Sequence, residues 1–162
     1  MNNAQFKKNP NDLTITVERF FPAEKQRVWN AFTNGEQLAR WWGPKDWPAT
    51  SVAFDFRVGG RWFYCMNGPE GQKAPGLIEY TEIDAPNSFS AIDAFCDENG
   101  VKNMELPSTQ WKASFAMIDQ GTQMTIVLSF ATEADMQKLI EMRFEEGFTD
   151  SLNNLEKYLL NN

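Results

Sequence analysis

Asp93 is the best candidate for a catalytic residue in the sequence. It lies in the segment 88–96, which alternates apolar and polar or small residues as a half-buried strand does. Burial of the face that carries Asp93 would raise the pKa of its carboxyl group and make it a general base. The opposite face, with Ser90, Ile92 and Ala94, is equally easy to bury. The alternation therefore leaves two alternatives open, a buried base or a carboxylate that is solvated or paired with an arginine.

Glu82 and Tyr64 complete the candidate catalytic set, as a second base and as a hydrogen-bond donor. With that aspartate they predict proton transfer on an apolar substrate, such as a cyclisation, dehydration or isomerisation. Glu82, Arg143, Glu145 and Glu146 could instead be polar anchors at the mouth of a cavity. The alternative for each is a place on a solvated face, where most charged helix residues lie.

Histidine is absent from the sequence, and its absence excludes several classes of enzyme. No Ser-His or Cys-His pair can form, so ordinary serine and cysteine hydrolase chemistry is excluded. Structural zinc takes four Cys or His ligands and the chain has two cysteines, so we expect no metal site. No glycine-rich phosphate loop occurs, and we expect no cofactor. These exclusions favour a binding protein over an enzyme.

The charge of the chain narrows the choice of partners. Its 162 residues include 22 acidic and 15 basic side chains, which gives a net charge of -7. This charge repels phosphate backbones, so we expect no nucleic-acid partner. No apolar run approaches the ~20 residues that span a bilayer, which predicts no membrane insertion. The segment Met1–Lys8 lacks the apolar core of a secretory signal, so we expect a cytoplasmic protein.

Aromatic side chains are the candidates for binding rather than catalysis. By alternation Trp62, Tyr64 and Met66 share one strand face. Two adjacent indoles cannot both point into one helix stripe, so we expect either Trp41 or Trp42 to face an opening as a gate. The alternative is that both plug the edge of the sheet. The mixture of aromatic residues with methionine and small residues favours a cavity wall over plain core.

Turn signals and apolar periods predict the elements that must position these residues. Residues 13–21 predict a strand, and two short helices over 23–33 and 36–41 follow it. Further turn signals predict about seven strands in all. Residues Glu133–Leu160 contain no proline and carry one broad apolar stripe, which predicts a single long C-terminal helix. Residues 1–12 lack an apolar period, so we expect a flexible lead-in before a single domain over residues 13–160.

Several short motifs occur in an order that resembles one known family. They are Phe21-Pro22-Ala23, Val28-Trp29-x-Ala31-Phe32-Thr33, Leu38-Ala39-Arg40-Trp41-Trp42-Gly43-Pro44, Val58-Gly59-Gly60-Arg61-Trp62, Asp93-Ala94-Phe95-x-Asp97-Glu98-x-Gly100 and Glu146-Gly147-x-x-x-Ser151-Leu152-x-x-Leu155. The series is similar to the activator of heat-shock protein 90 ATPase homologue family. The resemblance implies an α+β, START-like helix-grip fold of the SRPBCC superfamily, in which a curved antiparallel sheet grips the C-terminal helix. It also implies a hydrophobic cavity between them.

Binding of a small hydrophobic molecule, lipid-like or polyketide-like, is therefore the leading hypothesis. The residues expected to contact it are Trp41, Trp42, Trp62, Tyr64, Met66, Trp111, Phe115, Phe144 and Phe148. A proton-transfer enzyme is the first alternative. The second is a protein-interaction module, either a regulator of a chaperone ATPase or a self-associating protein, that presents its outer sheet face and the paired tryptophans.

Overall fold

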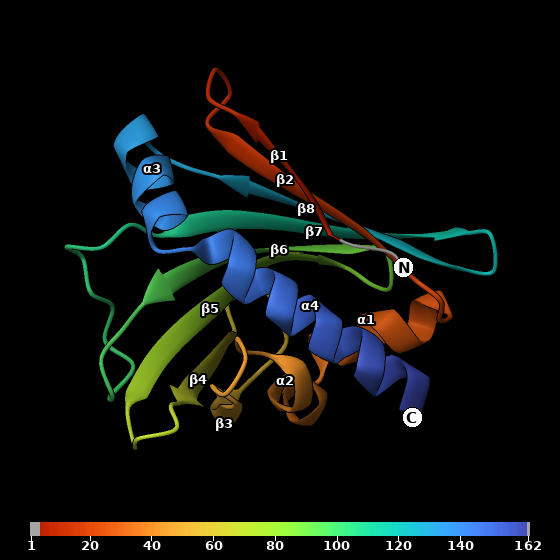
Figure 1. Cartoon of the computed structure of the whole chain (residues 1–162), viewed down its shortest axis with the longest axis horizontal. Coiled ribbons are helices and arrows are strands. Elements are labelled where there is room, and N and C mark those ends of the chain that lie inside the picture. The colour runs from red at the N-terminus through yellow and green to blue at the C-terminus, as the bar shows by residue number, and fades with distance from the viewer. Residues whose placement is uncertain (1–3, 162) are drawn as a thin grey trace.

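A curved antiparallel sheet forms the frame of the protein (Figure 1). The computed structural model describes residues 4–161. Eight strands pair in the order β1-β2-β8-β7-β6-β5-β4-β3. They are β1 (Gln5–Asn9), β2 (Thr14–Phe21), β3 (Ala49–Phe54), β4 (Arg61–Asn67), β5 (Lys73–Asp84), β6 (Ser88–Phe95), β7 (Thr109–Ile118) and β8 (Gly121–Ser129). The α+β helix-grip fold expected from the sequence is confirmed, with eight strands in place of about seven.

The additional strand, β1, lies inside the segment 1–12 that the sequence predicted to be a flexible lead-in. That prediction is wrong for residues 5–9, which pair with β2 along the edge of the sheet, and residues 1–3 lie outside the described residues. Most side chains of β1 are exposed, so no apolar alternation marks it in the sequence. Phe6 is the exception and packs edge-on against Phe144, with ring centroids 6.2 Å apart.

Two short helices, α1 (Lys25–Thr33) and α2 (Gly35–Trp41), follow β2 as the sequence predicts. Asn34 separates them, and its side-chain oxygen accepts hydrogen bonds from two backbone N–H groups in the first turn of α2. α2 ends at Trp41, and Trp42 returns to extended backbone with φ -71° and ψ 136°. This change of backbone direction lets the two adjacent indoles point to different places.

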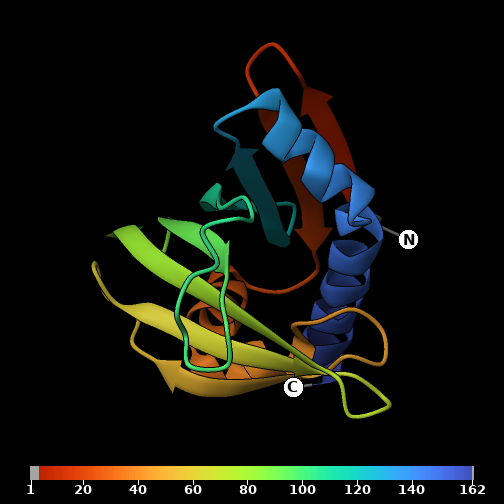
Figure 2. The ribbon, with the colours of Figure 1, turned by 90° about the vertical axis from the view of Figure 1, so that its left-hand side faces the viewer.

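The C-terminal region contains two helices, so the prediction of one helix over Glu133–Leu160 is wrong in this respect. α3 (Glu133–Glu141) and α4 (Phe144–Asn161) are separated by a turn in which Arg143 has a φ of 63°. A left-handed residue cannot continue a right-handed helix, so the chain changes direction there (Figure 2). Both helices keep a buried apolar side, which is why the apolar period runs through the break. No glycine or proline marks the turn in the sequence.

α4 lies across the concave face of the sheet (Figures 1 and 2). From its midpoint onward it is closely packed, with Leu152 and Leu155 fully buried and Leu159 nearly so. Burial of a leucine side chain stabilises the fold by roughly 1.5–3 kcal/mol, so these contacts fix the helix on the sheet. No helix in the described part of the chain has the length and apolar character needed to cross a membrane.

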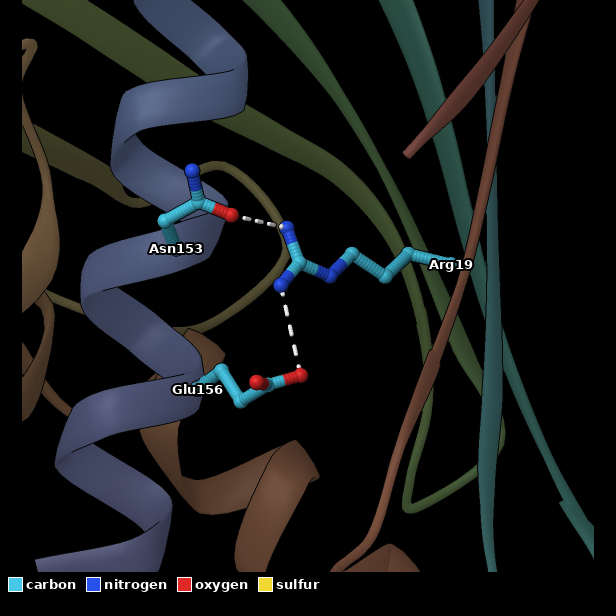
Figure 3. Close-up of polar contacts among 3 residues, drawn as sticks. All are labelled: Arg19, Asn153 and Glu156. Atoms are coloured by element: carbon cyan, nitrogen blue, oxygen red, sulfur yellow. Dashed lines mark hydrogen bonds and ion pairs between the residues drawn. The ribbon is translucent and has the colours of Figure 1, made fainter. Parts of the chain in front are cut away.

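A buried arginine also joins the C-terminal half of α4 to the sheet (Figure 3). Arg19 lies on the inward face of β2 and is 2% exposed. Its Nη1 donates a hydrogen bond to Asn153 Oδ1 at 2.7 Å, and its Nη2 lies 3.3 Å from Glu156 Oε1. Its Nε has no hydrogen-bond partner among the described residues. Sequence reasoning missed Arg19, although alternation along β2 places it on the same face as Ile15 and Val17.

Candidate ligand-binding site

A cavity opens between the sheet and the N-terminal half of α4. It has a volume of about 260 Å³ and is enclosed by strands β4 to β7, the segment after α2 and the turn between α3 and α4. Its wall includes these residues predicted to bind ligand: Trp42, Tyr64, Met66, Trp111, Phe144 and Phe148. The volume is near the lower end of the range for small-molecule pockets, and the wall is mainly apolar, as such pockets require.

Three other residues predicted to bind ligand, Trp41, Trp62 and Phe115, do not line this cavity. Trp41 is 1% exposed, and its indole N–H donates a hydrogen bond to the carbonyl oxygen of Ala31 at 2.9 Å. The indole N–H of Trp62 donates to Ser51 Oγ at 2.8 Å. Phe115 is likewise buried in the main core. The structure therefore places these three rings in packed core behind the cavity wall.

Trp42 is the member of the tryptophan pair that reaches the cavity. Its ring lies within 6.1 Å, centroid to centroid, of the rings of Trp62, Tyr64, Trp111 and Phe148. Because it is 8% exposed, it forms part of the wall and does not stand over the opening as an exposed lid. The indole connects the strands on one side of the cavity with α4 on the other, which gives the aromatic wall a fixed shape.

Asp93 lies on the inward face of β6 and lines the cavity. Alternation in the sequence could not decide which face of this strand is inward. Burial raises the pKa of the Asp93 carboxyl group from 3.8 to about 7. The side chain is half-buried, and no hydrogen bond or ion pair to its carboxylate occurs within residues 4–161. Its neighbours across the sheet are Ile78 and Thr109, and neither can neutralise its charge. A polar group without a partner is therefore aimed into an apolar space.

Tyr64 stands beside this carboxylate on the cavity wall. Burial raises the pKa of its hydroxyl well above 10, the charge of Asp93 raises it further, and a hydrogen bond from Trp42 opposes the shift. The hydroxyl is therefore a proton donor at neutral pH. A Cβ on Gly76 would lie 2.4 Å from the Tyr64 hydroxyl oxygen, so glycine at this position lets the ring lie across the neighbouring strand. A glycine inside a strand is the sequence signal that could have revealed this approach.

The remaining charged candidates are distributed differently from what the sequence suggested. Glu82 is exposed on the outer face of the sheet, after an irregularity in the pairing of β5 with β6, and does not line the cavity. Arg143 lines the mouth, where its Nε lies 2.7 Å from Glu146 Oε2. Glu145 pairs with Lys8 at 3.1 Å. Of these charged residues only Arg143 lines the cavity, and it is already paired with Glu146.

Two small residues of α4 shape the cavity. A Cβ on Gly147 would meet only the Cβ of Pro44, at 3.7 Å, which is an ordinary contact. Close packing therefore does not demand glycine, and its missing side chain leaves room in the cavity. Ser151 Oγ accepts a hydrogen bond from the backbone N–H of Gly43 at 3.0 Å and holds the segment after α2 against the helix. Within residues 4–161, no three Cys, Asp or Glu side chains gather as a metal site would require.

Comparisons with known proteins identify the family. A family model described as Activator of Hsp90 ATPase homolog 1-like protein matches residues 22–160. The chain belongs to this family. A solved structure from Mycobacterium smegmatis is 36% identical, with a TM-score of 0.89 over 96% of this chain and 95% of that chain. Another, from Arthrobacter aurescens, is 36% identical, with a TM-score of 0.92 over 98% and 92%.

A third solved structure, from Staphylococcus epidermidis, is 29% identical, with a TM-score of 0.85 over 97% of this chain and 94% of that chain. No curated protein matches this chain. The resemblance inferred from the motifs is thus confirmed, and the three solved structures share this fold over nearly their whole length.

Proposed function

We propose that this member of the family binds a small hydrophobic molecule in the cavity between the sheet and α4. The observation that carries the proposal is an apolar space of about 260 Å³ walled by aromatic and methionine side chains. Burial of apolar ligand surface supplies the free energy of binding, and the few polar groups fix the orientation of the ligand. Met66 is flexible and polarisable, which suits a wall that adapts to the ligand.

A cavity-filling variant tests this proposal. Gly147→Leu places a side chain in the cavity without a close contact to the backbone, because only Pro44 lies within 4 Å of its Cβ. We expect 4-phenylbutan-1-ol to bind the natural protein in isothermal titration calorimetry, and Gly147→Leu to weaken binding at least tenfold. Ala134→Leu on the exposed side of α3 is the matched control and should bind as the natural protein does. No binding by the natural protein, or equal binding by both variants, would contradict the proposal.

Proton transfer is a second candidate function, and the inward position of Asp93 is the observation that favours it. A carboxyl with a pKa of about 7 accepts a proton most effectively near neutral pH, and the Tyr64 hydroxyl beside it can donate one. An enzyme of this kind would turn over its apolar substrate at a rate that rises with pH through about 7. Asp93→Asn would abolish that turnover, whereas unchanged turnover would exclude the aspartate as the base.

Other expectations from the sequence stay predictions. A cytoplasmic location, self-association and a chaperone partner are consistent with membership of the family but rest on no contact in the structure. The paired tryptophans that were expected to present a docking surface are both buried, which favours binding of a small molecule over this form of protein interaction.

A further inference from the structure

The cavity combines two features that together select for one kind of ligand. Its wall contains several aromatic rings, among them Trp42, Trp111 and Phe148, which pack edge to face or tilted on one another. It also contains one half-buried carboxylate, Asp93, that has no hydrogen bond or ion pair within residues 4–161. Aromatic rings attract organic cations through the negative charge of their faces, and a carboxylate attracts them through its full charge.

We propose that the ligand of this cavity is an apolar organic cation, a hydrocarbon or aryl body that carries a single ammonium group, and that the ammonium group pairs with Asp93. The inference rests on the proposed binding function and names the chemical class of the ligand. The N–H groups of the ammonium supply the hydrogen bonds that the half-buried carboxylate lacks among the described residues, and the apolar body fills the aromatic part of the cavity.

The other charges around Asp93 favour a cation over an anion. Tyr64 faces it from β4, and Cys96 lies just after the end of β6. Both are neutral at neutral pH because burial raises the pKa of each. β5 and β7 contribute no charged group to the wall, and neither does α4. Arg143, at the mouth, is the one cation on the described wall, and it is exposed and paired with Glu146. An anionic ligand would therefore meet an unpaired carboxylate, and the net charge of -7 would oppose its approach.

The pairing makes binding depend on pH in a defined direction. An ammonium ion binds the ionised carboxylate, and burial raises the pKa of Asp93 to about 7 in the free protein. Affinity for the cation should therefore fall as the pH decreases below 7, by roughly tenfold or more between pH 8 and pH 5.5. A neutral alcohol of the same shape gains nothing from ionisation of Asp93, so its affinity should not fall over this range.

Isothermal titration calorimetry with 4-phenylbutylamine and 4-phenylbutan-1-ol tests the inference, because the two molecules differ only in the charged group. At pH 8 we expect the amine to bind at least tenfold more tightly than the alcohol. Asp93→Asn should remove this preference, because the amine then loses its anionic partner. Glu82→Gln removes a carboxylate from the outer face of the sheet and should preserve the preference.

The possible outcomes separate this inference from the proposed function. If the alcohol binds as tightly as the amine, or if Asp93→Asn keeps the preference, the ligand is not a cation, although the cavity still binds apolar molecules. If neither molecule binds, both the inference and the proposed function fail. The pH series on the natural protein gives a second measurement that needs no variant, and an amine affinity that is constant from pH 5.5 to pH 8 would overturn the inference.

Discussion

Two charged residues, Arg19 and Asp93, lie on the inner face of the sheet. α4 supplies polar partners to the first and none to the second. Arg19 on β2 meets Asn153 and Glu156 on the C-terminal half of the helix (Figure 3). Asp93 on β6 meets no polar partner on the N-terminal half and faces a cavity instead. A buried charge destabilises a protein unless it is paired and hydrogen-bonded. The first charge therefore stabilises the fold, whereas the second has no partner within residues 4–161, as pairing with the proposed ammonium ligand requires.

The packing of the helix repeats this contrast. From its midpoint onward, α4 places Leu152 and Leu155 in fully buried positions. The N-terminal half has Gly147 where a larger side chain would fit, and it follows a left-handed turn at Arg143. One helix thus closes one end of the sheet and leaves the other end open. Space and an unpaired polar group at the same end are the combination expected of a binding site.

Removal of Arg19 should give the largest change in stability. Arg19→Ala leaves Glu156 without its partner and empties a buried position, so we expect the free energy of unfolding to fall by about 3 kcal/mol. Urea denaturation measures the change. The matched control is Arg57→Ala, whose ion pair with Asp55 is exposed and should contribute less than ~1 kcal/mol. If both variants lost the same small amount, Arg19 would not be the structural contact described here.

Removal of the charge of Asp93 should have the opposite effect and raise the free energy of unfolding. The folded protein holds the Asp93 proton up to a pH of about 7, whereas an unfolded chain releases it near pH 4. Between these values the unfolded state binds fewer protons, so stability falls as the pH rises and the loss is complete above pH 7. We therefore expect Asp93→Asn to raise the free energy of unfolding by about 2 kcal/mol at pH 8.

The same variant at pH 4 is the control for this prediction. The carboxyl group is protonated in the folded protein there, so the aspartate and the asparagine are both neutral and the two proteins should be nearly equal in stability. A stability loss at pH 8 would mean that the carboxylate has a partner and that the two charged residues are alike.

Gly147→Ala should produce the smallest effect. A helix-interior glycine is less stable than alanine by up to ~1 kcal/mol, and the added Cβ would make only an ordinary contact with Pro44. We expect a gain of about 0.5 kcal/mol in the free energy of unfolding, measured by thermal or urea denaturation. A clear loss would show that the N-terminal half of α4 packs as closely as the C-terminal half.

Sequence reasoning predicted the fold well where local patterns determine it. Alternation and turn residues located most of the strands, and the ordered motifs identified the family. The patterns missed β1, whose edge position leaves no alternation, and the turn at Arg143, which interrupts no apolar period. These failures have one physical cause, because backbone pairing and helix direction are set by contacts that a local pattern does not contain.

The site was predicted less completely than the fold. Alternation could not choose the face of Asp93, because both faces of that strand could be buried, and only its neighbours in the folded sheet decide. Alternation also could not predict which of Trp41 and Trp42 reaches the cavity, because the directions of the two side chains depend on where α2 ends. Arg19 went unnoticed because its partners lie on a helix far along the chain. Chemical type is visible in a sequence, but the partners of a side chain are not.

An NMR titration tests the contrast between the two ends of the sheet most directly. The indole N–H signals of the tryptophans report on both regions, because Trp42 and Trp111 line the cavity while Trp29 packs against Phe56, Phe89 and Phe115, which do not line it. On addition of 4-phenylbutan-1-ol, we predict that the Trp42 and Trp111 signals shift in a saturable way and that the Trp29 signal stays in place. Equal shifts of all three signals, or no shift of Trp42 and Trp111 at saturation, would contradict a binding site at this end of the molecule.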